Sequence, residues 1–452
     1  MTPRVRICSI DIENIKNVLG GPIAMPHRVA GFNPDEGELL GIYGQNGTGK
    51  TAVVNALSLV QNLICGDGLQ KVAAALMTYG KPTATISILF SVEGKSRSFD
   101  VRYSVTLERD GENVHIRRET LSAKSIEPNA RYNTIVEFKE DGAPATDDIA
   151  PQSTLSKVLE HCTKQDILIS KVLANQESRS YIFNDRMLEL LLLLEDEHAG
   201  ILKAVRQFAE HRLYIVTHGK SGMVNLGLQP IPFARANQTG PTIGVCVVNL
   251  NEPGIIPMNA YRDFQRTLEQ INSVLCKIIP GLTLEARELG SELKTADIEQ
   301  MRFELLAVRG DIRIPLKLES DGIKKIIAIL LLWITVSNTP GTCLVVDELD
   351  ASIFEYLLGE LLSVWREHAR GQLIFTAHNL HPLEVLDKRS VVFTTIDPYH
   401  RFIRLKNIKS TNNLRDVYLR SIFIGGQEFE LYDETNKTEI ARAIRRCAAP
   451  RK

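Results

Sequence analysis

The chain of 452 residues lacks the cysteine pattern of a zinc-binding or disulfide-linked domain. Its seven cysteines stand alone, and no two of them form a C-x-x-C pair; they lie at 8, 65, 162, 246, 276, 343 and 447. The absence of such pairs excludes a zinc hook or ribbon, and an odd, scattered set is typical of a reducing compartment. We therefore expect a cytoplasmic protein.

Long apolar segments are missing as well. The longest apolar run, 326–336, follows two lysines and is much shorter than the roughly 20 residues that span a bilayer. Residues 1–10 alternate charged with apolar side chains and lack the apolar centre of a signal peptide. The sequence therefore predicts a buried helix at 326–336 and no association with a membrane.

An excess of charge of either sign is also missing. Lys and Arg number 53 and Asp and Glu 54, so the formal net charge is −1. Balanced charge gives no global indication of nucleic-acid binding, and any basic surface must be local. Hydrophobic residues at 44% and charged residues at 24% are near globular averages, which excludes wholesale disorder and a coiled-coil rod.

The patterns that are present predict an α/β chain. Alternation predicts a strand at 4–12, an apolar run predicts another at 38–43, and helical spacing follows at 53–64. Alternation over 84–118 predicts an antiparallel sheet with one wet face. From 301 onward, strands (302–308, 312–318, 342–347, 371–376) alternate with helices (322–337, 354–369), which predicts a parallel core. We expect the blocks 1–64 and 301–406 to share one sheet.

The middle of the chain is less regular. Residues 119–155 are polar and contain Pro128, Gly142, Pro144 and Pro151. This composition predicts loops, as does that of 216–240. Residues 156–215 and 258–279 have helical patterns. No heptad is sustained over three or four repeats, so a compact lobe is expected here rather than coiled-coil arms.

One glycine-rich turn carries a complete phosphate-binding motif. The eight residues of G-x-x-x-x-G-K-[ST] are Gly44, Gln45, Asn46, Gly47, Thr48, Gly49, Lys50 and Thr51, between an apolar strand and an amphipathic helix. Glycines let backbone N–H groups curl around an anion at a helix N-terminus. Lys50 is expected to reach the β- and γ-phosphates, and the Thr51 hydroxyl to bind Mg²⁺.

Two acidic residues end a later apolar strand. Residues 343–350 read CLVVDELD, which places Asp347 at the carboxyl edge of a parallel sheet, where such folds bind ligands. We expect Asp347 to hold Mg²⁺ and Glu348 to act as the general base for an attacking water. Strands often end in acids, so this assignment depends on the phosphate loop.

Two further motifs complete the candidate site. Residues 371–379 read GQLIFTAHN, and His378 is predicted to contact the γ-phosphate; a polar cap of the strand is the plainer alternative. Residues 319–325 read ESDGIKK, where Ser320 and Gly322 open the apolar helix and could donate to phosphate. The plainer alternative is that Ser320 only caps the helix, a role that requires no bound nucleotide.

In this order, the four motifs resemble ATP-binding-cassette (ABC-type) ATPases, in the branch shared by SMC, RecF and OLD-like proteins. The resemblance is carried by Ile12–Lys16 before the phosphate loop, the S-D-G-I-K-K segment at 320–325, D-E-L-D-A-S at 347–352 and F-T-A-H-N at 375–379. It covers about 1–64 and 315–395. The segment around Ser320 and Gly322 matches the signature motif of these ATPases. Its S-x-G-x-K form is similar to that of the AAA ATPases of anti-phage defence systems (Septu, PARIS and OLD-like).

The resemblance implies an α/β, P-loop ATPase head with an antiparallel β-subdomain and an inserted helical lobe. It divides the chain into 1–155, the N-terminal half of the head; 156–300, the lobe; and 301–452, the C-terminal half with a short basic tail. It also implies that copies of the chain form a homodimer or higher oligomer around ATP and Mg²⁺. Ser320 and Gly322 would act on the nucleotide of the other subunit. Asp350 and Ser352 would lie in the loop that crosses the dimer. A glutamine loop is not identified, because Gln152, Gln165 and Gln176 all compete.

Three functions follow from these observations. The first is an ATPase sensor or regulator in anti-phage defence, working with a separately encoded effector, a nuclease or toxin, because no D-x-D pair follows residue 387. The second is a RecF- or SMC-like DNA-repair ATPase, with a local basic face for DNA; the candidates are Arg117, Arg118, Lys157, Lys164, Lys171, Arg179 and Arg186. Solvated helix charges are the plainer interpretation of that set. A transporter cassette is the third, and the large insertion disfavours it.

Overall fold

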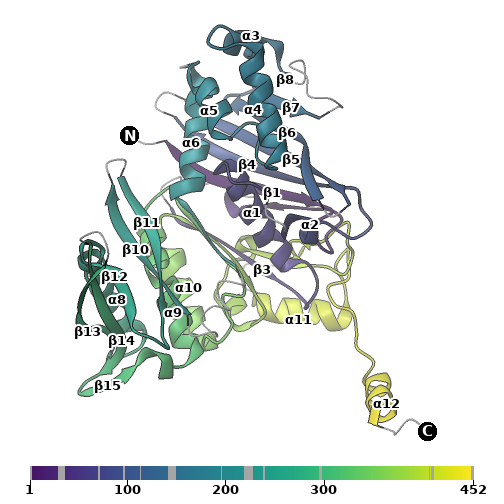
Figure 1. Ribbon diagram of the computed structural model, residues 1–452. Coiled ribbons are helices and arrows are strands. Elements are labelled where there is room, and N and C mark those ends of the chain that lie inside the picture. The colour runs from purple at the N-terminus through teal and green to yellow at the C-terminus, as the bar shows by residue number, and fades with distance from the viewer. Residues whose placement is uncertain are drawn as a thin grey trace.

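A computed structural model describes most of the chain (Figure 1). The residues it describes are 3–28, 36–69, 72–94, 97–111, 113–140, 149–194, 196–217, 228–237, 240–294, 298–406, 408 and 412–448. A parallel sheet lies at the centre, an antiparallel sheet with helices lies above it in this view, and a small β lobe lies to the left.

The central sheet joins the two ends of the chain. Its strand order is β19 (Phe402–Ile403), β18 (Val391–Thr394), β3 (Glu38–Tyr43), β17 (Gln372–Ala377), β16 (Cys343–Val346) and β9 (Leu213–Val216). All described pairs are parallel except β18 with β19. Because β3 pairs with β17 on one side and β18 on the other, the prediction that the two blocks share a sheet is confirmed for β3, β16, β17 and β18. It is wrong for the predicted strands at 4–12, 302–308 and 312–318, which belong to separate antiparallel sheets.

Both faces of this sheet are covered, which explains its uninterrupted apolar strands. Leu40 and Ile42 of β3 face one core, which contains α1 (Lys50–Ile64) and the antiparallel sheet. Leu39 and Tyr43 face the other, which contains α9 (Asp321–Asn338) and α10 (Glu355–His368). The apolar run predicted as a buried helix is therefore the body of α9, packed against the sheet.

The antiparallel sheet has the one wet face that alternation predicts. Its order is β2 (Gly21–Ala24), β1 (Arg4–Glu13), β4 (Thr83–Glu93), β5 (Ser98–Asp110), β6 (Asn113–Ser125), β7 (Asn133–Lys139) and β8 (Ile149–Ala150). Tyr103 and Val105 of β5 are buried, whereas Ser104 on the opposite face pairs with Ser87 at 2.8 Å between hydroxyl oxygens. Helix α2 (Val72–Leu76) lies near this sheet (Figure 1).

Four helices follow the antiparallel sheet, and part of this region was predicted wrongly. They are α3 (Gln152–Leu159), α4 (Lys164–Gln176), α5 (Asp185–Leu192) and α6 (Glu197–His211). Residues 119–155, predicted as loops, contain most of β6 together with β7, β8 and the start of α3. The polar residues of β6 alternate with the buried Leu121 and Ala123, so their polarity marks a wet sheet face rather than a loop.

A small β lobe replaces much of the predicted helical insertion. It contains β10 (Leu228–Asn237), β11 (Gly240–Asn249), β12 (Gly254–Pro257), β13 (Leu282–Lys294), β14 (Ile298–Arg309) and β15 (Ile312–Pro315), with α8 (Met258–Ile278). Among the described residues, the helical prediction for 156–300 thus holds for α3–α6 and α8 and is wrong for β9–β14. Pro230 and Pro232 lie within β10, whose ribbon with β11 has just two strands and so tolerates proline at its edges. Residues 218–227 of the predicted 216–240 loop lie outside the described residues.

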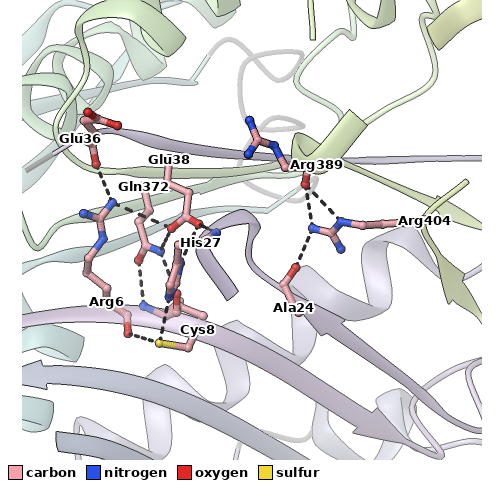
Figure 2. A network of polar contacts seen from close by, with 10 residues as sticks. Arg6, Cys8, Ala24, His27, Glu36, Glu38, Gln372, Arg389 and Arg404 are labelled. Carbon is pink, nitrogen blue, oxygen red and sulfur yellow. Dashed lines mark hydrogen bonds and ion pairs between the residues drawn. The ribbon is translucent and has the colours of Figure 1, made fainter. Parts of the chain in front are cut away.

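A buried polar network around Glu38 joins the two large sheets (Figure 2). The Glu38 carboxylate accepts from the backbone N–H of His27 at 2.8 Å and from Gln372 Nε2 at 2.8 Å. Gln372 also exchanges two hydrogen bonds of 2.8 Å with the backbone of Ile7 on β1. The network fixes the starts of β3 and β17, so the opposite ends of these strands are held in a defined register.

Two further helices lie in the described part of the C-terminal region. Helix α11 (Leu414–Ile424) packs beside the central sheet, and α12 (Lys437–Ala448) projects away from the body (Figure 1). Within the described part of the chain, no helix has the length and apolar character needed to span a bilayer.

Candidate nucleotide site

The phosphate loop connects β3 to α1 in a conformation that requires glycine. Gly44, Gly47 and Gly49 have φ values of 152°, 79° and 91°, a region that side chains disfavour. A Cβ atom at Gly44 would also overlap the Thr394 hydroxyl, and one at Gly49 would overlap Val18. The backbone therefore curls tightly and ends at the N-terminus of α1, as anion binding requires.

Lys50 closes this loop from inside. Its Nζ donates to the carbonyl oxygens of Gly44 at 2.8 Å and Gln45 at 2.9 Å. Burial lowers the pKa of Lys50 to about 8, and the carboxylates of Asp350, Glu348 and Asp347 oppose that shift. A lysine held at the curve of the loop is placed to meet an anion bound there.

The other loop residues hold its shape. The Thr48 hydroxyl donates to Gln45 O at 2.6 Å and lies 2.5 Å from the Thr394 hydroxyl. The Gln45 amide exchanges hydrogen bonds with the backbone of Asp433, at 3.0 and 3.4 Å. Asn17 donates to Gly47 O.

Asp347 has the geometry of a metal ligand. It is fully buried at the end of β16, and its Oδ1 accepts from Thr376 Oγ1 at 2.7 Å and from Thr51 Oγ1 at 3.3 Å. Its Oδ2 has no hydrogen-bond partner among the residues that the structure describes. A buried carboxylate oxygen without a donor is costly, and a cation beside Thr51 would satisfy it. Thr51 and Asp347 therefore fit Mg²⁺, which usually takes one or two protein oxygens together with phosphates and water.

Glu348 occupies an uncommon backbone conformation next to this carboxylate. Its φ is 50°, in the left-handed region that non-glycine residues seldom adopt. Its backbone N–H donates to Thr376 Oγ1 at 2.7 Å. Such strain persists where surrounding contacts over-determine it and often accompanies function.

His378 follows β17 at the same edge of the sheet. Its backbone N–H and that of Asn379 donate to Asp350 Oδ2, at 2.8 and 2.6 Å. Burial and the neighbouring Lys50 ammonium both lower the pKa of His378. The imidazole is therefore neutral over more of the physiological range than an ordinary histidine.

These residues converge on one cleft with a volume of about 670 Å³. Its lining consists of Lys16, Asn17, Asn46, Gly47, Gly49, Lys50, Thr51, Ala52, Glu348 and His378. A second cleft of about 580 Å³ shares Lys16, Thr51 and Glu348 with it and includes Asp347. Three sequence segments, 44–51, 347–348 and 378, are thus brought together by the carboxyl ends of β3, β16 and β17.

Sequence reasoning did not single out Lys16 and Thr376, which the structure brings to this site. Lys16 lines both clefts; burial lowers its pKa, and the Asp347 carboxylate opposes that shift. Thr376 supports Asp347 and Glu348 through one hydroxyl. Lys16 stands in the N-terminal stretch that carries the resemblance, which was the available signal. Thr376 was visible as a polar residue inside an apolar strand.

Ser320 and Gly322 lie apart from this cleft. Ser320 is exposed and caps α9 by accepting from the Ile323 N–H at 3.4 Å, and neither residue appears in the lining of the two clefts. A Cβ at Gly322 would overlap the carbonyl oxygen of Ser352. Glycine at 322 is therefore required by packing within the chain, whatever it does toward a second subunit.

Asp350, expected in a loop that crosses a dimer, directs one carboxylate oxygen to the backbone of His378 and Asn379 in its own chain. Its other oxygen, Oδ1, is buried without a hydrogen-bond partner among the described residues.

None of the glutamine-loop candidates Gln152, Gln165 and Gln176 is among the described residues that line the two clefts. Gln176 lines a separate polar cavity of about 500 Å³ with His115 and Glu140. The glutamine loop therefore stays unassigned.

The basic face considered for DNA is largely neutralised. Lys171 is buried, and five of the other candidates form ion pairs: Arg117 with Glu108, Arg118 with Glu137, Lys157 with Asp196, Arg179 with Glu177 and Arg186 with Asp166. Cations already paired with carboxylates contribute less to the attraction of a phosphate backbone.

Comparison with models of known families and with curated proteins gives no match. Solved structures that are similar include an SMC head bound to the C-terminal winged-helix domain of ScpA, at 13% identity and a TM-score of 0.44, covering 88% of this chain and 97% of that one. The Smc head domain from Pyrococcus furiosus with an extended coiled coil, bound to the C-terminal domain of ScpA, has 15% identity and a TM-score of 0.42, covering 89% and 96%. The SMC head domain from Thermotoga maritima has 14% identity and a TM-score of 0.37, covering 89% and 100%. Because the TM-scores of these three structures are below 0.5, their similarity establishes neither the fold nor the function of this chain.

Proposed function

We propose that this chain is an ATPase that binds ATP with Mg²⁺ in the cleft between the phosphate loop and the Asp347–Glu348 turn. The observation that supports this most is the position of Asp347. Its buried Oδ2, which has no hydrogen-bond partner in the described part of the chain, lies on the carboxylate that also accepts from Thr51, the last residue of the phosphate loop. This contact supports a single site formed by the phosphate loop and the carboxylate.

Each residue has a defined role in this proposal. The N–H groups of the loop and Lys50 hold the β- and γ-phosphates, and Lys16 supplies a second cation at the same cleft. Thr51 and Asp347 would hold Mg²⁺, and the ion would neutralise charge that develops on the phosphates. Glu348 accepts a proton from the attacking water, and neutral His378 donates to the γ-phosphate.

A metal titration tests this assignment. Asp347→Asn keeps the shape of the side chain but removes the charge that Mg²⁺ requires. We expect wild-type ATP affinity to rise when Mg²⁺ replaces EDTA, and Asp347→Asn to lose that gain while binding ATP in EDTA as wild type does. Calorimetric titration with ATP measures both. Asp433→Asn, at an exposed carboxylate near Gln45, is the matched control. An undiminished Mg²⁺ effect in Asp347→Asn would contradict the metal site.

We further propose that the site is completed by a second copy of the chain. Ser320 is exposed at the N-terminus of α9 and does not line its own cleft, and the N-terminus of a long helix favours an anion. A homodimer would bring Ser320 to the nucleotide of the other subunit, as the sequence resemblance implies.

The biological role we propose is that of a sensor or regulator in anti-phage defence, acting through a separately encoded nuclease or toxin. The S-D-G-I-K-K form of the signature supports it. The alternative of a DNA-repair ATPase has less support, because most of its basic face is paired with carboxylates. The neighbouring gene tests the choice: a nuclease or toxin gene favours defence, and a recombination gene favours repair.

A further inference from the structure

Lys325 links the first turn of α9 to the backbone of Glu348. Its side chain is buried, and its Nζ donates to the carbonyl oxygen of Glu348 and, at 3.2 Å, to that of Ala351. An ammonium group has three N–H donors and no acceptor, so two of its three donors are used on this one turn. Burial lowers the pKa of Lys325, and the carboxylates of Asp350, Glu348 and Asp347 oppose the shift.

The turn that Lys325 holds is the strained part of the site. Glu348 and Ser352 both have left-handed backbones, with φ of 50° and 64°, and each such residue costs on the order of 1 kcal/mol or more. The Glu348 N–H donates to Thr376, while its carbonyl accepts from Lys325 and from the Ala351 N–H at 3.0 Å. Both peptide groups of Glu348 are therefore fixed, and they determine where its side chain enters the cleft.

A second contact holds α9 and the turn together. Gly322 lies against the carbonyl oxygen of Ser352 so closely that a Cβ atom would overlap it. Gly322 and Lys325 are three residues apart and so share one face of the helix. The start of α9 is thus docked on the 347–352 turn at two points, and a shift of the helix would move the Glu348 backbone.

We propose that Lys325 is a positioning residue for Glu348, which it holds in the orientation needed to act on the attacking water. This inference rests on the proposed role of Glu348 as general base. It assigns to α9 a function within its own chain, separate from any contact of Ser320 with a second subunit.

The test compares Lys325→Met, Lys325→Arg and Lys324→Met in the full-length chain. Lys324 is the matched control, because it is also buried at the start of α9 but pairs with Asp321 at 2.9 Å. We expect Lys325→Met to lower kcat roughly 10- to 100-fold, as small misplacements of catalytic groups do, with an ATP dissociation constant close to that of wild type. Lys325→Arg keeps the N–H donors, so its kcat should lie between those of Lys325→Met and wild type. Lys324→Met should hydrolyse ATP at close to the wild-type rate.

A double variant separates positioning from general damage. If Lys325 acts through Glu348, adding Lys325→Met to Glu348→Gln should lower kcat no further. Additive losses, a wild-type kcat in Lys325→Met, or an equal loss in Lys324→Met would each overturn the proposal. If Glu348→Gln alone keeps the wild-type kcat, the assignment of Glu348 fails, and that result does not depend on Lys325. Thermal unfolding of each variant shows whether it is folded, and if Lys325→Met is not, Lys325→Gln replaces it.

Discussion

At the scale of single residues, Lys50 is the cation that the proposed function places on the β- and γ-phosphates. Burial lowers its pKa to about 8, so it is charged below that pH and progressively neutral above it. Because a phosphate favours the charged form, ATP affinity should be constant below pH 8 and should weaken up to about tenfold per pH unit above it. Binding titrations from about pH 6.5 to about pH 9.5 measure the effect.

Two substitutions control this experiment. Lys50→Ala should weaken binding about 10- to 100-fold at pH 7, the loss expected for a hydrogen bond to a charged group, and should remove the pH dependence. Lys50→Arg keeps its charge throughout, so whatever affinity it retains should not change with pH. Binding by Lys50→Ala that equals wild type would exclude the phosphate loop as the nucleotide site.

At this scale, local motifs predicted part of the site and tertiary contacts supplied the rest. Gly44–Thr51 and Asp347–Glu348 are contiguous patterns whose chemistry can be read from neighbouring residues. The supporting role of Thr376, the inward orientation of Asp350 and the packing need for Gly322 depend on segments that meet only after folding. No spacing in the sequence encodes those contacts.

At the scale of elements, Glu119 fastens the helices to the antiparallel sheet. It is fully buried on β6 and accepts from Tyr103 Oη at 2.7 Å, Ser180 Oγ at 2.6 Å and the backbone N–H groups of Tyr181 and Ile182 at 2.7 and 3.2 Å. All four partners are donors. The carboxylate therefore anchors the segment just before α5.

Glu119→Gln should lower the free energy of unfolding by about 1–3 kcal/mol, because its amide nitrogen would face donors instead of accepting from them.

Burial raises the pKa of Glu119 above its ordinary value of 4.5. The folded chain therefore binds this proton more tightly than the unfolded chain does, and the stability due to Glu119 falls as pH rises from 4.5 through the raised pKa. Denaturant unfolding at several pH values measures both effects.

The control for this prediction is Glu127→Gln, at an exposed position after β6, which should leave stability unchanged. Equal stability of Glu119→Gln and wild type would mean that the buried contacts contribute nothing net.

Elements were predictable where one pattern dominated. The strands at 4–12, 38–43, 342–347 and 371–376 and the helices at 258–279, 322–337 and 354–369 agree with β1, β3, β16, β17, α8, α9 and α10 within a few residues. The ribbon of β10 and β11 was not predicted, because Pro230 and Pro232 are turn signals in most contexts. Its pairing register is set by the partner strand, which local composition does not report.

At the scale of the whole molecule, the proposed dimer makes a complementation prediction. A Lys50→Ala chain lacks a working phosphate loop, and a Ser320→Arg chain would block the surface that faces the other subunit. Mixed dimers would then contain one intact composite site, so co-expression should restore up to about half of the wild-type ATPase rate. Ser320 is preferable to Gly322 for this purpose, since any side chain at 322 disturbs Ser352 in its own chain.

The outcome is informative only with proven mixed dimers, so each chain carries a different affinity tag and is purified through both. Ser320→Ala, which loses the helix cap without adding bulk, is the matched control. Mixed dimers without ATPase activity would indicate that Ser320 is a cap alone, or that both sites must function together.

The most direct test of the central claim is the comparison of ATP binding and phosphate release in Glu348→Gln. The substitution removes the base but keeps Asp347, Thr51 and Lys50, so we predict MgATP binding close to that of wild type. Phosphate release should fall about 10²- to 10⁴-fold, the usual contribution of a general base. Wild-type phosphate release by a folded, ATP-binding Glu348→Gln chain would contradict hydrolysis at this site by the proposed mechanism.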